Sequence, residues 1–159
     1  MPVDSNSTFH GTAIVVGETG LLITGPSGAG KTMLAMRCLH AARSRGWNSS
    51  LIGDDRVRLE VASGRLIARS PAAISGLAEI RGSGVVPVSA RFSAVVQLIV
   101  APGVANGSDR VPVENETAEI NGLSLPLVRL LYNAAADPLA VICTCAPRFF
   151  PGADAGLHC

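Results

Sequence analysis

A glycine-rich segment, residues 25–32, restricts the fold more than any other feature of this chain. It reads Gly25-Pro26-Ser27-Gly28-Ala29-Gly30-Lys31-Thr32 and matches the phosphate-binding pattern G-x-x-x-x-G-K-[ST]. That pattern needs a buried strand before the loop and a helix directly after it. Leu21 to Thr24 is typical of such a strand. The sequence also predicts a helix that begins near Lys31, with an apolar face formed by Leu34, Ala35, Cys38, Leu39 and Ala42.

The residue types of this loop suit the phosphates of a nucleotide. Lys31 is the only lysine, whereas the other twelve basic residues are arginine, and a compact ammonium is the charge that reaches β- and γ-phosphates. The glycines let backbone N–H groups converge on an anion, and the Thr32 hydroxyl can bind Mg²⁺. We therefore expect a nucleoside triphosphate to bind through Gly25, Pro26, Ser27, Gly28, Ala29, Gly30, Lys31 and Thr32. The alternative is a glycine-rich turn that carries an ordinary surface lysine.

Composition limits the class of protein. The 159 residues suit one domain, 1–159, whose part from about residue 147 has no clear pattern. A formal net charge of +1 without a basic stripe argues against a nucleic-acid partner. We find no signal peptide and no run of membrane-spanning length, so we expect a soluble, cytoplasmic protein. The four cysteines lack the spacing of a metal site, and we interpret them as reduced and mostly structural, with a redox role for Cys143 and Cys145 as the alternative.

Short strands and turns dominate the rest of the chain. Polar character predicts that residues 111–119 are exposed, and the tail 151–159 is expected to fray. The apolar run Leu139 to Cys145 fits a helix or a strand equally well. The other predicted elements are a hairpin of Thr12–Val16 with Gly20–Thr24, a strand Ser50–Gly53, a hairpin of Arg56–Val61 with Arg65–Arg69, a strand Val95–Val100 and a loop at 106–110.

Two acidic residues, Asp54 and Asp55, follow the strand predicted after the first helix. Downstream of a phosphate loop, one carboxylate can accept a proton from an attacking hydroxyl while the other helps to hold a metal. Because adjacent strand residues point to opposite faces, both can face the γ-phosphate only if the strand ends there. The alternative is a solvated acidic turn. Further on, Glu79-Ile80-Arg81-Gly82 adds a carboxylate and a guanidinium beside a glycine-containing turn.

These motifs, in this order, resemble the catalytic domain of the HPr kinase/phosphorylase family. The specific part of the resemblance covers Phe9 to Val88, and a weaker part covers Val95 to Leu131. The chain looks like the short form of the family, which consists of the catalytic domain alone. The motifs that carry the resemblance are His10-Gly11, the first hairpin, the phosphate loop, Asp54-Asp55-Arg56-Val57, and the run from Ile74 to Val86 that contains Glu79-Ile80-Arg81-Gly82.

The resemblance implies an α/β fold, a P-loop-containing kinase domain related to the HPr kinase/PEP carboxykinase type, with a mixed sheet and hairpins flanking a Walker A loop and helix. It implies ATP-dependent phosphorylation of a serine on the phosphocarrier protein HPr, and phosphorolysis of phosphoserine-HPr to pyrophosphate. It also implies ATP and Mg²⁺ as cofactors and a homo-oligomer, a hexamer. The residues that it implies are His10, Lys31, Asp54, Asp55 and Arg81 for catalysis, with Asp55 as the base, and Thr32 and Glu79 for the metal.

Two other classes of function stay open at this stage. A small-molecule kinase with the same loop would have no need of the run Glu79 to Gly82, and a nucleotide-binding regulatory module with weakened catalysis would tolerate changes at the acidic pair. The chain also departs from the family pattern. Met33 stands where an acidic residue is common, the stretch 43–50 is long, and the C-terminal Pro-Gly-Arg-Asn segment is not recognisable. Arg129 is our candidate for the family's late catalytic arginine.

Overall fold

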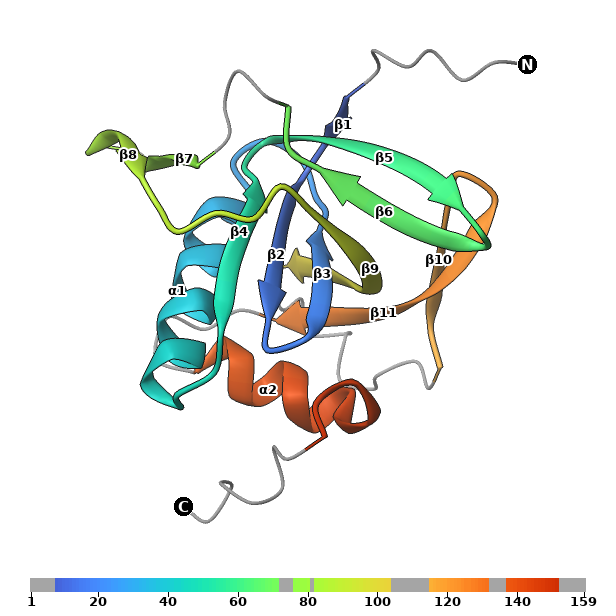
Figure 1. Ribbon diagram of the computed structural model, residues 1–159. Coiled ribbons are helices and arrows are strands. Elements are labelled where there is room, and N and C mark those ends of the chain that lie inside the picture. Colours follow the sequence, from blue (N-terminus) through green and yellow to red (C-terminus); the bar gives the residue numbers. More distant parts are fainter. Residues whose placement is uncertain (1–7, 72–75, 81, 104–114, 132–136, 152–159) are drawn as a thin grey trace.

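The fold is a curled mixed sheet with two helices on one face and two of its β-hairpins curled over the other (Figure 1). The computed structural model describes residues 8–71, 76–80, 82–103, 115–131 and 137–151. The main sheet has the order β1-β5-β6-β9-β3-β2-β4, with β11 paired to β9 and β10 paired to β11, and β7 pairs with β8 separately. The strands are β1 (Phe9–His10), β2 (Thr12–Val16), β3 (Thr19–Ile23), β4 (Ser49–Gly53), β5 (Arg56–Ala62), β6 (Arg65–Arg69), β7 (Leu77–Ile80), β8 (Gly84–Pro87), β9 (Ser93–Gly103), β10 (Thr117–Ile120) and β11 (Leu123–Leu131), and the helices are α1 (Lys31–Ser44) and α2 (Pro138–Cys145).

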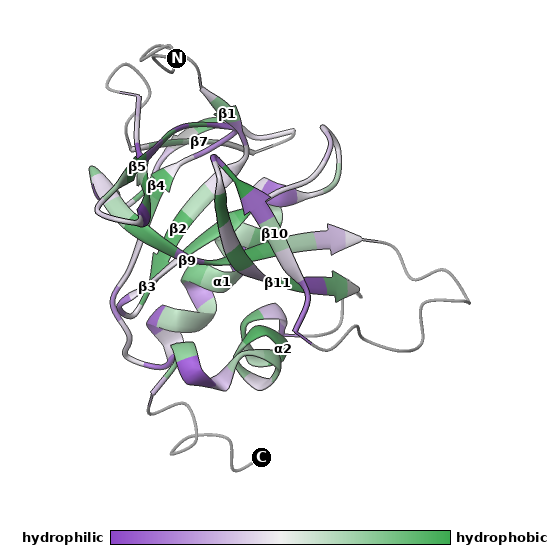
Figure 2. Cartoon of the chain, turned by 90° about the vertical axis from the view of Figure 1, so that its right-hand side faces the viewer, coloured by the Kyte–Doolittle hydropathy of each residue, from purple (hydrophilic) through white to green (hydrophobic). Residues whose placement is uncertain are grey.

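The central strands β2 and β3 are buried at every position. Alternation along β2 directs Ile14 and Val16 to the core beneath the helices, and Ala13 and Val15 to the core beneath the hairpins. Figure 2 shows the strands in the middle of the molecule mainly in green, between the two layers. Both faces of these strands are therefore covered, which explains why they are apolar throughout.

Most of the predicted elements are confirmed. The hairpins β2–β3 and β5–β6, the strand β4 and the buried segment of β9 lie where the sequence predicts them. Helix α1 begins at Lys31, and its predicted apolar face is buried. The loop at 106–110 and the tail from residue 152 lie outside the described residues.

The apolar run near the C-terminus, which the sequence left open, is the helix α2. Asp137 caps it by accepting hydrogen bonds from the N–H groups of Leu139 (3.0 Å) and Ala140 (3.2 Å). The Asp137 carboxylate also accepts a hydrogen bond from the Arg45 guanidinium at the end of α1, at 2.7 Å. Partial burial acts to raise the pKa of Asp137, but these hydrogen bonds outweigh it and hold the pKa below its ordinary value. The cap thus also links the two helices.

The expectation that residues 111–119 are exposed is wrong for the last residues of this segment. Residues from Thr117 form the strand β10, which pairs with β11 and alternates between exposed and half-buried positions. Asn121 and Gly122 both take positive φ, 50° and 80°, which is the geometry of a tight hairpin turn. An Asn-Gly pair is a local signal for such a turn, so the sequence did contain the information.

Two of the four cysteines are packed in the core beneath the helices. Burial raises the pKa of Cys38 to about 12 and that of Cys143 to about 11. Both thiols therefore stay protonated near neutral pH and pack as small apolar side chains, whereas Cys145 is exposed. Within the described part of the chain, neither helix has the length and apolar character needed to cross a membrane.

Candidate active site

The phosphate loop is held at the end of β3. The Thr24 N–H donates to the Val100 carbonyl of β9 at 2.9 Å, which continues the sheet pairing to the residue directly before the loop. Gly25, Gly28 and Gly30 have φ values of 147°, 83° and 87°, a range that favours glycine, as the sequence predicts. Gly30 is also the N-cap of α1 and has no side chain to bond the first N–H groups of the helix. The positive end of the helix dipole therefore faces the loop.

Lys31 is nearly buried, with 6% of its surface exposed, although it carries a charge. Its Nζ donates to the carbonyl oxygens of Gly25, at 2.8 Å, and Pro26, at 3.0 Å. Lys31 is the first residue of α1. The ammonium group of the only lysine is thus held by the backbone of the loop, where a phosphate oxygen could replace either carbonyl.

Asp54 is the second nearly buried charged group, with 7% of its surface exposed. One oxygen, Oδ1, accepts hydrogen bonds from the hydroxyl of Thr32 at 2.8 Å and from the hydroxyl of Thr12 at 3.0 Å. These donors come from α1 and β2, so Asp54, which follows β4, contacts both elements. Asp54 is therefore joined to the phosphate loop through Thr32, the residue expected to bind Mg²⁺.

Asp55 differs from its neighbour in exposure and conformation. Its side chain is 51% exposed, and its Oδ1 lies 3.3 Å from Nε2 of His10. Because β4 ends at Gly53 and Asp55 has φ 63°, strand alternation does not continue through the pair. The two carboxylates consequently line the same cavity, which resolves the question that the sequence left open.

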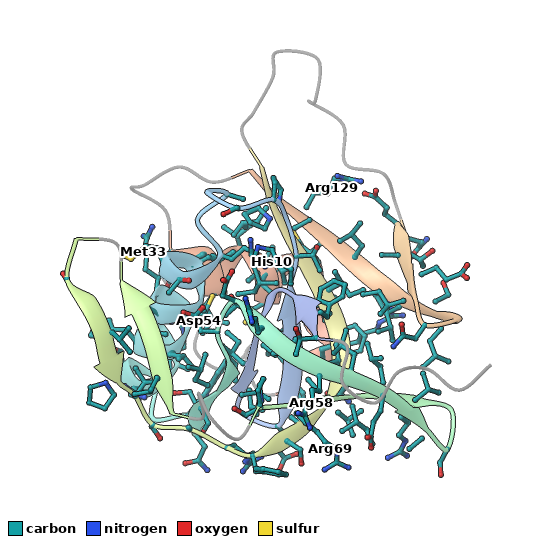
Figure 3. All side chains as sticks on the ribbon, turned by 90° about the horizontal axis from the view of Figure 1, so that it is seen from above. His10, Met33, Asp54, Arg58, Arg69 and Arg129 are labelled. Carbon is teal, nitrogen blue, oxygen red and sulfur yellow. The ribbon has the colours of Figure 1, made fainter. Side chains whose placement is uncertain are left out.

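This cavity has a volume of about 460 Å³, within the usual range for small-molecule sites. Figure 3 shows Asp54 and His10 near the start of α1, with Met33 on the side of the β7–β8 hairpin. Met33 is half exposed and adds no carboxylate to the cavity that it lines. The cavity is lined by Ser27, Gly28, Gly30, Lys31, Thr32, Met33, Asp54 and Asp55.

The remaining predicted site residues are only partly described. Glu79 lies in β7, whose hairpin with β8 packs near α1, but the placement of its side chain is not described, and Arg81 lies outside the described residues. Arg129 lies on β11, which is parallel to β9, as β3 is, and it lies at the same end of these strands as the loop. Its guanidinium binds the Glu116 carboxylate at 2.6 to 2.9 Å. Arg129 does not line the cavity.

Sequence reasoning missed one residue of the site, Thr12. It is fully buried, and its hydroxyl contacts both the Asp54 carboxylate and the Asp55 backbone. The available signal was weak, since a threonine at the start of an apolar strand is common in any sheet. The contact joins residues 42 positions apart, which no local pattern reveals.

A larger cavity lies at the other end of β3. Its volume is about 590 Å³, and its lining comes mainly from the start of β6, the first half of β9 and the start of β11. Glu18, Arg65 and Arg91 stand on its rim and are all exposed. Among the residues that the structure describes, none of the predicted site residues lines it.

Comparisons with known proteins agree with the fold and the motifs. A family profile described as HPr Serine kinase C-terminal domain matches residues 3–150. An HPr kinase/phosphorylase of Bordetella pertussis is 34% identical over 153 residues, which cover 89% of this chain and 47% of that protein. One of Clostridium beijerinckii is 34% identical over 127 residues, which cover 74% of this chain and 40% of that protein. The chain thus spans less than half the length of these relatives.

A solved structure has the same fold. It is described as the Hpr(Ser) kinase/phosphatase from Coxiella burnetii, and it superposes with a TM-score of 0.71 over 90% of each chain, at 22% sequence identity. The mixed α/β fold expected for a P-loop kinase domain of this type is therefore confirmed. Together with the profile match over residues 3–150, this shows that the chain belongs to the HPr serine kinase C-terminal domain family.

Proposed function

We propose that this chain uses ATP to phosphorylate a serine of an HPr-type phosphocarrier protein, and that it also converts phosphoserine-HPr and inorganic phosphate to HPr and pyrophosphate. The observation that carries the proposal is the convergence of the phosphate loop and two adjacent carboxylates on one cavity. One carboxylate is hydrogen-bonded to Thr32, and the other lies beside His10. The names of the curated relatives support the choice of HPr as substrate.

The residues around the loop suit a magnesium nucleotide. Backbone N–H groups of the loop and the Lys31 ammonium would bind the β- and γ-phosphates. Thr32 donates its only hydroxyl hydrogen to Asp54, so its oxygen lone pairs are available to a cation. A hydroxyl and carboxylates are the hard oxygen ligands that Mg²⁺ prefers, and we assign Thr32 and Glu79 to it. When bound, Mg²⁺ would neutralise charge on the transferred phosphoryl group.

Asp55 is the proposed general base. Its exposed carboxylate can accept the proton of the serine hydroxyl while the serine oxygen attacks the γ-phosphorus. The bond between the γ-phosphorus and the bridging oxygen breaks, ADP leaves, and the proton on Asp55 passes to solvent. His10 orients Asp55 from 3.3 Å, and we assign Arg81 to the charge on the transferred group.

The same residues can run phosphorolysis. An oxygen of inorganic phosphate attacks the phosphorus of phosphoserine, the bond to the serine oxygen breaks, and pyrophosphate forms. Protonated Asp55 then gives its proton to the serine oxygen, as microscopic reversibility requires. His10, at the edge of the cavity, would orient the attacking phosphate.

We further propose that residues 1–159 form one catalytic domain that acts in the cytoplasm, where ATP is available. By family resemblance we expect it to assemble as a homo-oligomer, a hexamer. Size-exclusion chromatography with light scattering would measure the assembly directly.

The test uses purified protein with Mg-ATP and HPr. We expect intact mass to show one added phosphoryl group and peptide mapping to place it on a serine. In the reverse assay, phosphoserine-HPr with inorganic phosphate should release pyrophosphate. A protein that binds Mg-ATP but leaves HPr unmodified would favour a regulatory module, and a kinase that releases no pyrophosphate would restrict the proposal to the forward reaction.

A further inference from the structure

Three consecutive residues, His10, Gly11 and Thr12, hold the turn at Asp55. The carboxylate of Asp55 lies beside His10, its carbonyl accepts the Gly11 N–H at 3.2 Å, and its own N–H donates to the Thr12 hydroxyl at 3.4 Å. The short junction between β1 and β2 thus contacts each polar group of Asp55. A non-glycine residue at φ 63° needs such support, since the left-handed region is unfavourable for it.

Thr12 connects this turn to the neighbouring carboxylate. Its hydroxyl accepts the Asp55 N–H and donates its single hydrogen to Oδ1 of Asp54 at 3.0 Å. The residue is fully buried, and the rest of β2 is apolar. A buried hydroxyl in an apolar strand is costly unless it is hydrogen-bonded, and both of its bonds go to the acidic pair.

We propose that Thr12 is a positioning residue of the magnesium–nucleotide site and acts through Asp54. The hydroxyls of Thr12 and Thr32 both donate to Oδ1 of Asp54. Thr12 therefore fixes the position of the oxygen that accepts the hydrogen of the Thr32 hydroxyl. With that hydrogen fixed, the lone pairs of Thr32 face the cavity, where a cation would bind. This inference rests on the proposed function, because it assumes that Mg²⁺ and a nucleotide bind at this loop.

The test compares Thr12→Val with wild type by calorimetric titration of ADP at a series of Mg²⁺ concentrations and in EDTA. Valine keeps the shape of threonine and removes the hydroxyl. We expect the Mg²⁺ concentration for half-maximal enhancement of ADP affinity to rise about tenfold, the lower end of the usual effect of losing a partner behind a metal ligand. The affinity for ADP in EDTA should stay within about twofold of wild type.

Two control variants separate positioning from general stability. Thr12→Ser keeps the hydroxyl and should retain the wild-type Mg²⁺ dependence to within about twofold. Thr19→Val removes another buried hydroxyl, which donates to the Phe149 carbonyl at the opposite end of β3. It should lower the melting temperature as Thr12→Val does and leave the Mg²⁺ dependence unchanged. Thr12→Ala replaces Thr12→Val if the latter does not fold.

The outcomes distinguish the two levels of the proposal. A folded Thr12→Val protein with the wild-type Mg²⁺ dependence would overturn the role of Thr12 and leave the proposed function intact. An equal shift in Thr19→Val would also overturn it, because the effect would then reflect general loosening of the sheet. If the ADP affinity of wild type does not respond to Mg²⁺, the proposed metal site fails and the role of Thr12 fails with it.

Discussion

The two ends of strand β3 carry two cavities that differ in the burial and hydrogen bonding of their charged groups. The larger one, about 590 Å³, has its charged groups Glu18, Arg65 and Arg91 exposed on the rim. The smaller one, about 460 Å³, has Lys31 and Asp54 nearly buried and hydrogen-bonded to the loop and to neighbouring elements. Cavity size therefore does not favour the candidate site, whereas convergent buried polar groups do.

The backbone gives the same contrast. Ser63 and Gly64 have positive φ because they form the two-residue turn of the β5–β6 hairpin, and Gly64 lines the larger cavity. Asp55, at the smaller cavity, has positive φ outside any hairpin turn and is held there by residues 10–12. The hairpin turn requires positive φ in order to reverse the chain. At Asp55 no chain reversal requires it, and unfavourable backbone conformations that are held by neighbouring contacts are found mainly at functional sites.

The largest expected effect comes from removing the buried charge. In Lys31→Ala we expect ATP affinity to fall by about a hundredfold or more, because two or more charge-assisted hydrogen bonds to phosphate are lost, and phosphoryl transfer to disappear with it. Calorimetry with Mg-ATP measures the affinity. Arg43→Ala, which removes a positive charge from the last turn of the same helix, is the matched control and should bind as wild type does. Tight binding of Mg-ATP by Lys31→Ala would contradict the assignment of this loop as the phosphate-binding site.

The next effect separates the two carboxylates. Asp55→Asn should bind Mg-ATP as wild type does and lose about two to four orders of magnitude in kcat, the usual contribution of a general base. Asp54→Asn should instead raise the Mg²⁺ requirement and lower the melting temperature, because Asp54 is buried and bonded to Thr12 and Thr32. Wild-type turnover in Asp55→Asn would move the role of base away from this residue.

A smaller effect is expected at His10. Its contact with Asp55 is half exposed, so solvent weakens it, and the kinase reaction of His10→Ala should fall by no more than about fivefold. Phosphorolysis should fall further, because we assign His10 to the orientation of inorganic phosphate. Pyrophosphate release and HPr phosphorylation, measured on one preparation, give the ratio. An equal loss in both directions would contradict the separate role.

The sequence predicts the phosphate loop and α1 well because their information is local. Glycines at three fixed positions, a lysine at the helix start and an apolar face of helical spacing each specify a backbone conformation within a few residues. The structure has each of these features. Two further local signals were present in the sequence: the Asn121-Gly122 turn, which favours the β10–β11 hairpin, and Asp137-Pro138, which favours the start of α2.

The arrangement of the acidic pair could not be predicted in the same way. Strand alternation would separate Asp54 from Asp55, and it is broken by contacts with residues 10–12, more than 40 positions away. No spacing rule contains that information, since it depends on β1 pairing with β5 beside the turn. The residues alone suggested a catalytic use for the acidic pair, whereas only the resemblance to the kinase family pointed to Asp55 as the base and to His10.

The smallest effect is expected at the larger cavity, and it tests whether this cavity takes part in nucleotide binding. In the double variant Arg65→Ala/Arg91→Ala, both guanidinium groups of its rim are removed. Both side chains are exposed, and among the described residues neither takes part in an ion pair, so the free energy of unfolding should change by no more than about 1 kcal/mol. The cavity lies at the opposite end of β3 from the loop, so kcat and KM for Mg-ATP should stay within about twofold of wild type.

Kinase assays across a range of ATP concentrations measure both, with Lys31→Ala as the positive control. A change in KM for ATP comparable to that of a loop variant would show that the larger cavity takes part in nucleotide binding, and buried polar groups would no longer be sufficient to tell the two ends apart.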